Sequence, residues 1–182
     1  MLPSGNDAAF VLAKYFGKML FEKKGYTEKD KTRIKSFEFD NHNTFVKYFL
    51  REMNEQCAML QMKNTNWDSP HGLNNKESLT TVSDMFKLSE RVKDQPLHLK
   101  VNATKVYRCT AMNEQDGNLV PGRNYTWISN MRMLGVDGFI GQKKGWTPPA
   151  GHCIALEYKK DGHHFSIVTI NSKTKNTLWT EV

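Results

Sequence analysis

The chain has 182 residues, of which 38% are hydrophobic and 11% aromatic, an ordinary composition for one globular domain with a real core. Its 26 Lys and Arg against 19 Asp and Glu leave a net charge of +7, which would attract phosphates, anionic lipid or acidic ligands without choosing among them. Acidic residues lie between the basic ones, which argues against a nucleic-acid-binding stripe. Three cysteines without a C-x-x-C pair argue against a disulfide framework. No apolar run reaches the ~18 residues of a transmembrane helix.

The first two predicted elements are helices. Apolar residues recur at helical spacing from Asn6 to Phe16, and a second such pattern begins near Thr44, a suitable N-cap, and runs to Leu60. Between them, residues 17–43 are dense in charged side chains and lack a continuous apolar face. We expect this stretch to be an exposed, charged segment that lies outside the predicted helices.

A loop and a third helix follow. Residues 63–75 are rich in Asn, Asp, Ser, Pro and Gly, which is turn chemistry without periodicity. Thr81, with Asp84 three residues later, forms a near capping box. This pattern predicts a helix that runs through Val92 and is ended by Pro96.

The last third of the chain changes to strand patterns. Short runs of β-branched or aromatic residues lie at 101–109, 139–142, 154–158 and 165–170. The sequence Lys160-Asp161-Gly162-His163 between the last two runs is a hairpin-turn signal. Helices first and strands last predict a single α+β domain over residues 1–182, in which helices pack on an antiparallel sheet.

Three short motifs stand in a definite order along the chain. They are Ser4-Gly5-Asn6, His71-Gly72-Leu73-Asn74, and Gly141-Gln142-Lys143-Lys144-Gly145-Trp146-Thr147 followed by Ala150-Gly151-His152-Cys153. Here the chain resembles the D-alanyl-D-alanine carboxypeptidase group of penicillin-binding proteins (peptidase S11), serine acyl-transfer enzymes whose signature is S-x-x-K, S-x-N and K-T-G in that order. The resemblance covers most of the chain and implies a β-lactamase/transpeptidase-like fold, incomplete at both ends, with residues 17–43 as a charged insertion.

The resemblance implies catalytic roles for Ser4 and Asn6. The serine would exchange a proton near the leaving group, while the asparagine amide would hold the peptide carbonyl and orient a nearby lysine. A glycine between them lets the backbone approach a ligand closely. The alternative is that Ser-Gly-Asn is a plain helix N-cap.

The resemblance assigns Lys143 to the catalytic lysine of K-T-G, whose ammonium attracts the terminal carboxylate of a D-alanyl peptide or a β-lactam. Gly145 keeps the strand edge open to ligand, and Trp146 and Thr147 complete the implied substrate-binding stretch. Lys144 replaces the family's threonine, so that its charge substitutes for the hydroxyl or its bulk blocks the site. The alternative is a surface lysine pair that binds no ligand.

Histidines are not expected to carry the chemistry. His71 has a pKa suited to a general base, but in its turn-rich loop we expect it to close hydrogen bonds. His163 and His164 lie on the hairpin without a third ligand at metal spacing, so no metal site is expected. The resemblance implies no cofactor.

The nucleophile motif should lie N-terminal to Ser4 on its own helix, with its lysine one turn from the serine. Only three residues precede Ser4. A literal S-x-x-K at residues 172–175 follows the lysine strand and is interpreted as chance. We therefore expect this polypeptide alone not to form an acyl-enzyme.

Three functional interpretations stay open. The chain belongs to an active peptidase whose nucleophile comes from preceding sequence or a separate chain, or it is an inactive homologue that serves as a structural or accessory subunit of a larger assembly. Alternatively, it is a basic binding module, in which case Ser4 and Lys143 lie far apart. The compartment is open as well: the family is typically extracytoplasmic, no signal segment is recognised, and unpaired cysteines also fit an intracellular or organellar site.

Overall fold

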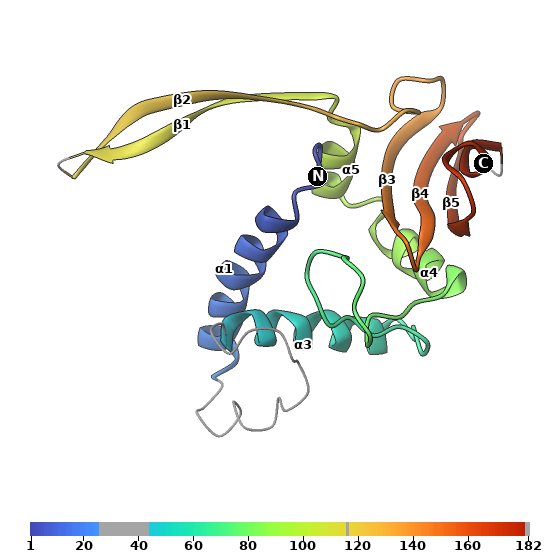
Figure 1. The fold of residues 1–182 in the computed structure, drawn as a ribbon, viewed down its shortest axis with the longest axis horizontal. Coiled ribbons are helices and arrows are strands. Elements are labelled where there is room, and N and C mark those ends of the chain that lie inside the picture. The colour runs from blue at the N-terminus through green and yellow to red at the C-terminus, as the bar shows by residue number, and fades with distance from the viewer. Residues whose placement is uncertain (26–43, 116, 181–182) are drawn as a thin grey trace.

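The computed structural model describes residues 1–25, 44–115 and 117–180. Four helices come first, α1 (Asn6–Lys24), α3 (Thr44–Met59), α4 (Val82–Val92) and α5 (Pro96–Ala103). Five strands follow, β1 (Val106–Gln115), β2 (Asn118–Ile128), β3 (Phe139–Thr147), β4 (Gly151–Lys160) and β5 (His163–Ser172), and then α6 (Lys175–Thr180) (Figure 1). The predicted α+β class is confirmed.

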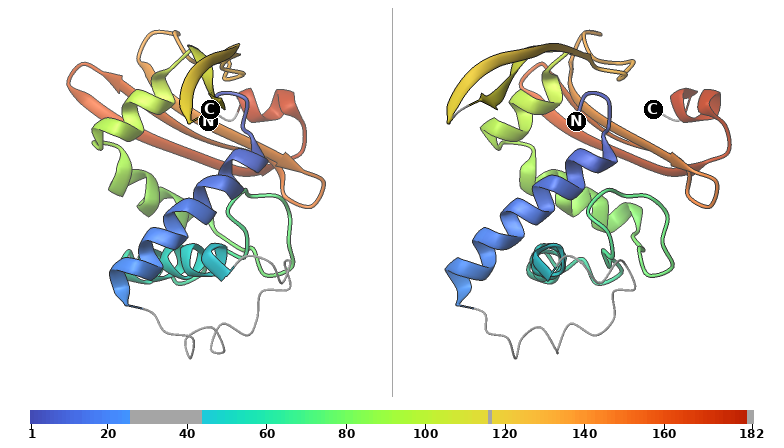
Figure 2. Two further views of the ribbon diagram at one scale, coloured as in Figure 1. Left: turned by 90° about the vertical axis from the view of Figure 1, so that its left-hand side faces the viewer. Right: turned by 60° about the vertical axis from the view of Figure 1, so that its left-hand side comes forward.

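Strands β3, β4 and β5 form an antiparallel sheet in that order. Helices α4 and α5 lie on one face of this sheet and α6 lies on the other (Figure 2). The centre of the α6 face is a small core of Ile154, Leu156 and Leu178. The predicted hairpin turn is confirmed, because Asp161 and Gly162 both adopt the left-handed backbone, with φ of 50° and 78°, that two-residue hairpin turns require.

Strands β1 and β2 form a separate two-stranded ribbon that extends away from the other elements (Figure 1). Strand β2 was not predicted. It contains Pro121 and Gly122, two residue types that are unfavourable in a strand interior. A two-stranded ribbon tolerates them, since every strand in it has a free edge, and the pairing shifts register nearby, between Thr110 and Met112.

Two predicted boundaries near Pro96 are wrong. Pro96 does not simply end a helix: it stands in the first turn of α5, where its missing N–H costs nothing and its fixed φ suits the helix. Residues 101–103, predicted to begin a strand, are therefore helical, and β1 starts at Val106.

Helix α1 packs on α3 through Ala13, Val46 and Leu50. Gly17 lies at the crossing, where any Cβ would collide with the carbonyl oxygen of Phe45. The prediction that an exposed charged segment begins at Gly17 is therefore wrong. Gly17 lies within the helix and lets α1 and α3 approach closely. The helix continues through Lys24, and residues 26–43, the remainder of the predicted insertion, lie outside the described residues.

The loop between α3 and α4 is tied to the start of α4. The hydroxyl of Thr81 accepts a hydrogen bond from the Asp84 N–H at 3.2 Å, so the predicted N-cap is confirmed. The buried Asp84 carboxylate accepts hydrogen bonds from the Asn64 N–H, the Thr65 hydroxyl and the Lys87 ammonium at 2.8, 3.0 and 2.9 Å. The Lys87 hydrogen bond is the main cause that lowers the pKa of Asp84. These bonds anchor the loop that carries His71 toward the sheet.

Candidate active site

A cavity of about 350 Å³ opens where the N-terminus of α1, the α3–α4 loop and strand β3 meet. Its wall is formed by Ser4, Asn6, His71, Gly72, Leu73, Met85, Lys143, Lys144, Gly145, Trp146, Thr147, Cys153, Ile154, Ala155, Val168, Thr169 and Ile170. All three sequence motifs therefore meet at one place. Ser4 and Lys143 both line this cavity, whereas the basic binding module predicts that they lie far apart.

Ser4 and Asn6 reach the cavity from the turn that precedes α1. Ser4 adopts a left-handed backbone with φ of 57°, and its N–H donates to the carbonyl oxygen of Met1 at 3.0 Å. The N-cap of α1 is Gly5, the middle residue of the Ser-Gly-Asn motif. The helix therefore begins within this motif, as the alternative interpretation has it, but no side chain makes a capping hydrogen bond. Within the described residues, the side chains of Ser4 and Asn6 make no hydrogen bond, which leaves both available to a ligand.

Lys143 brings the main charge into the cavity. Its half-buried ammonium donates to the carbonyl oxygen of Lys144 at 2.6 Å. Burial, and secondarily the nearby charge of Lys144, lower the pKa of Lys143. The cavity wall contains no Asp or Glu, so the structure provides no counter-ion there within the described residues. A partly dehydrated cation without a counter-ion favours an anionic ligand.

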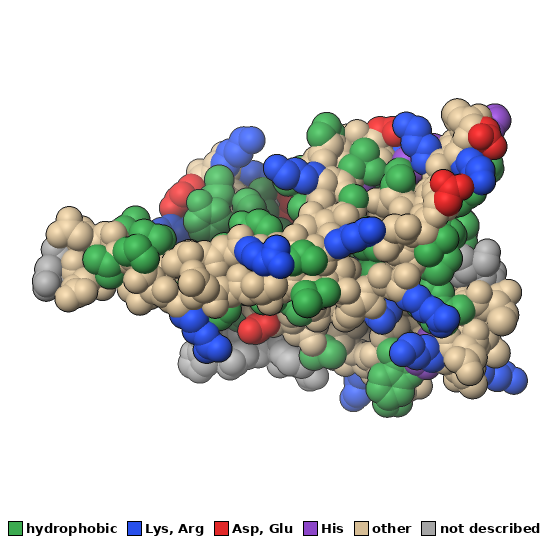
Figure 3. All heavy atoms as spheres, turned by 90° about the horizontal axis from the view of Figure 1, so that it is seen from above, with side chains coloured by type: hydrophobic (Ala, Val, Ile, Leu, Met, Phe, Trp, Pro, Cys, Tyr) green, Lys and Arg blue, Asp and Glu red, His purple; other side chains and the backbone are tan. Residues whose placement is uncertain are grey.

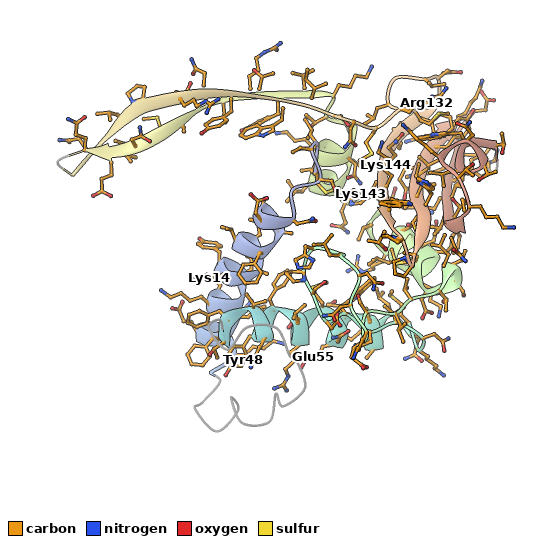
Figure 4. The ribbon with its side chains drawn as sticks, viewed as in Figure 1. Lys14, Tyr48, Glu55, Arg132, Lys143 and Lys144 are labelled. Atoms are coloured by element: carbon orange, nitrogen blue, oxygen red, sulfur yellow. The ribbon has the colours of Figure 1, made fainter. Side chains whose placement is uncertain are left out.

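Neighbouring residues of β3 point to opposite faces of the sheet. Lys143 pairs with Ala155 and Lys144 pairs with Ile154. Both partners line the cavity, and Ile154 also packs under α6. Lys144 contributes to the cavity wall from the edge of β3, on the sheet face opposite to that of Lys143. Figure 4 labels both lysines on this strand.

The end of β3 leaves open space beside the cavity. A Cβ on Gly145 would meet no atom within 4 Å, so the strand edge is open, as predicted. The Trp146 side chain is 59% exposed, and its ring centroid lies 5.9 Å from that of His152. The hydroxyl of Thr147 accepts a hydrogen bond from the Ala150 N–H at 3.3 Å, which helps to close the β3–β4 turn.

His71 closes its own turn, as predicted. Its Nδ1 accepts a hydrogen bond from the Leu73 N–H at 3.1 Å, across Gly72 with φ of 77°. Burial lowers the pKa of His71, and the charge of Asp68 opposes this shift. A neutral ring with its acceptor nitrogen occupied suits a structural role in the cavity wall.

Sequence reasoning missed the apolar wall of the cavity. Met85 comes from α4, Ala155 from β4, and Val168 and Ile170 from β5. None belongs to a motif. The pairing of β4 with β5 brings Ala155, Val168 and Ile170 together, and the packing of α4 on β5 adds Met85. Cys153 also lines the cavity, with its thiol 3.5 Å from the carbonyl oxygen of Ala150.

The other candidate groups lie elsewhere. Ser172, the serine of the literal S-x-x-K, is 4% exposed at the end of β5 and does not line the cavity. His164 pairs with the buried Glu157 at 2.8 Å. Among the described residues, no three His, Cys, Asp or Glu side chains gather as a metal site would require.

Comparisons with known proteins agree with the fold. Residues 40–174 match the model of the family Peptidase S11, described as D-alanyl-D-alanine carboxypeptidase. This range includes Lys143 and begins after Ser4 and Asn6. The D-alanyl-D-alanine carboxypeptidase of Streptomyces sp. (strain K15) is 26% identical over 163 residues, which are 89% of this chain and 48% of that protein. The chain thus spans about half the length of that relative.

Solved structures show the same relation. The crystal structure of the Streptomyces K15 DD-transpeptidase matches with a TM-score of 0.71 and 25% identity, over 96% of this chain and 58% of that one. A penicillin-binding protein homologue from Mycobacterium tuberculosis matches with a TM-score of 0.66 and 21% identity, over 97% of this chain and 55% of that one, a likeness of fold alone. Among the helices of the described residues, none combines the length and the hydropathy that crossing a bilayer requires.

Proposed function

Because the chain belongs to the peptidase S11 family of D-alanyl-D-alanine carboxypeptidases, we propose that its cavity binds the D-alanyl end of a peptide, or a β-lactam, with the terminal carboxylate against Lys143. The observation that carries this proposal is the half-buried ammonium of Lys143 in a wall without acidic residues. A charge-assisted hydrogen bond to a carboxylate is stronger there than at an exposed lysine.

The two polar groups on the opposite wall suit the rest of such a ligand. We propose that the Asn6 amide holds the peptide carbonyl and that the Ser4 hydroxyl moves a proton near the leaving group. Both groups are available, because within the described residues neither side chain is used in a hydrogen bond. The open edge at Gly145 leaves room for the ligand backbone.

Hydrolysis through an acyl-enzyme needs a serine that a lysine can deprotonate. Among the described residues, Ser4 is the only serine in the cavity wall, and no lysine follows it at the S-x-x-K spacing. We therefore propose that this chain forms the substrate-binding part of the site, and that the nucleophile is supplied by polypeptide other than these 182 residues. The whole protein would then be a serine-type carboxypeptidase acting on D-alanyl peptides.

One observation favours a second candidate function. Lys144 stands where the family has a threonine, so a long ammonium side chain replaces the hydroxyl that would hydrogen-bond the carboxylate. An inactive homologue that serves as an accessory subunit would tolerate this change. Such a subunit would bind the ligand, but the assembly that contains it would form no acyl-enzyme at this site.

The test is calorimetric titration of the 182-residue chain with N-acetyl-D-Ala-D-Ala. We expect binding that Lys143→Ala weakens about tenfold or more, since each factor of ten corresponds to ~1.4 kcal/mol. Lys63→Ala, which removes an exposed charge outside the cavity, is the matched control and leaves the affinity unchanged. Absence of binding, or binding that ignores Lys143, contradicts the proposal.

Labelling with a fluorescent penicillin separates binding from acylation. The 182-residue chain is expected to stay unlabelled, while the complete native protein is expected to label if it is the active peptidase. A native protein that binds the D-alanyl peptide but does not label supports the accessory subunit instead. Covalent labelling of the 182-residue chain would show that the nucleophile lies within it.

A further inference from the structure

Strand β3 is the edge strand of the β3-β4-β5 sheet, and within the described residues its outer side has no strand partner. A ligand that lies along this edge is therefore within reach of side chains on both faces of the sheet. Lys143 stands on the cavity face. Lys144, the next residue, stands on the face that α6 covers.

A second cation lies next to Lys144. Helix α6 begins with Lys175 and packs through Leu178 on Ile154, the pairing partner of Lys144. Lys175 and Leu178 lie three residues apart, so they share one side of α6, and this side faces the part of the sheet that carries Lys144. Burial, and secondarily the charge of Lys175, lower the pKa of Lys144. Among the described residues, neither lysine forms a salt bridge, so nothing in this part of the chain offsets the repulsion.

Arg132 is a further cation near α6, and an aromatic ring contacts it. The guanidinium of Arg132 lies 5.7 Å from the ring centroid of Trp179 in a cation–π contact. It adds to the positive potential at this end of the molecule, where Figure 4 labels it. Lys144 and Lys175 therefore remain as the pair that an anion would bridge.

We propose that the ligand of this cavity carries a second anionic group, a carboxylate or a phosphate, and that Lys144 and Lys175 bind it across the edge of β3. The inference rests on the proposed function, since Lys143 is taken to hold the terminal carboxylate. It makes Lys144 a specificity-determining residue. A threonine at this position would select no extra charge, whereas an uncompensated lysine pair favours a dianionic D-alanyl-type ligand over a monoanionic one.

The experiment compares two ligands that differ by one charge and little else, N-acetyl-D-Ala-D-Glu and N-acetyl-D-Ala-D-Gln. Calorimetry on the 182-residue chain is expected to give about three- to tenfold tighter binding of the D-Glu peptide, the range of one partly exposed ion pair. The preference should shrink as salt is raised, because the lysine pair is near the surface. N-acetyl-D-Ala-D-Ser and the same peptide with an O-phosphorylated serine form a second matched pair. Comparing the two pairs shows whether a phosphate increases the affinity more than a carboxylate does.

Variants assign the preference to residues. Lys144→Thr and Lys175→Gln are each expected to bring the D-Glu to D-Gln affinity ratio close to one while leaving the D-Gln peptide bound. Lys143→Ala should weaken both peptides, and Lys63→Ala should change neither. A ratio that survives both Lys144→Thr and Lys175→Gln overturns the assignment.

The outcomes also separate this inference from the proposed function. Equal affinities for the two peptides, with binding that still depends on Lys143, overturn the second anionic group and leave the proposed function standing. If neither peptide binds while N-acetyl-D-Ala-D-Ala does, the inference fails and the proposed function stands. If none of the three peptides binds, both proposals fail. A D-Glu preference that is lost in Lys144→Thr supports the inference.

Discussion

Strands β4 and β1 are each ten residues long and pair antiparallel with their neighbours, but they differ in what covers them. Strand β4 lies between α6 on one face and α4 and α5 on the other, and it buries Ile154, Leu156 and Glu157 (Figure 2). None of the residues described in β1 and β2 is buried.

The ribbon is held by its own side chains instead. The rings of Tyr107 and Trp127 stack across the strands with centroids 6.2 Å apart, and Tyr125 stacks on Trp127 at 5.3 Å. Hydrophobic side chains remain visible along the ribbon in Figure 3. Leu119 of β2 is 70% exposed. Antiparallel pairing alone therefore makes strands, while a core and a site arise only where helices complete the layers.

The largest effect on stability is expected when a side chain is truncated in the core under α6. Leu156 is 1% exposed at the centre of the α6 face, so Leu156→Ala should lower the free energy of unfolding by about 2–5 kcal/mol. Leu119→Ala in the ribbon removes the same atoms from an exposed site and should cost less than about 0.5 kcal/mol. Urea unfolding of both variants measures the difference. Equal losses would mean that the ribbon is covered in solution.

A second test uses the buried carboxyl of the covered sheet. Burial raises the pKa of Glu157 above its ordinary value of 4.5, although hydrogen bonds from Ser166 and His164 oppose the shift. A raised pKa means that the folded state holds the proton more tightly. The resulting stability is fully present below about pH 4.5 and is lost as the pH rises through the raised pKa.

Glu157→Gln should flatten this part of the stability curve. Thermal unfolding between about pH 4 and pH 8 measures it, with Glu114→Gln on the ribbon as the control that removes an exposed carboxyl. A wild-type protein whose stability from Glu157 rises with pH over this window would show that the carboxyl is charged and well paired in the fold.

The smallest effect is expected from shortening the ribbon. Residues 113 and 120 face each other near its tip, so residues 114–119 can be replaced by Asn-Gly, which favours a two-residue hairpin turn. Because the cavity lies at the other sheet, binding of N-acetyl-D-Ala-D-Ala should stay within about twofold of the unshortened chain. A tenfold loss would show that the ribbon takes part in the site.

Local patterns were sufficient for several elements. The helix starts near Asn6 and Thr44, the cap at Thr81 and the turn at Gly162 were predicted, because periodicity, capping and turn residues act within a few positions. The errors arose where one residue type has two uses. Pro96 can end a helix or begin one, and which of the two it does depends on what the following turn packs against.

The sequence by itself determined the α+β class, the order of the three motifs and the resemblance that led to Ser4, Asn6 and Lys143. Only the tertiary structure decided that these residues share a cavity, and that Lys144 stands on the other sheet face beside Lys175. The physical reason is that strand pairing and helix packing join residues far apart along the chain. Their contacts depend on which layers cover each face, and no local pattern encodes that.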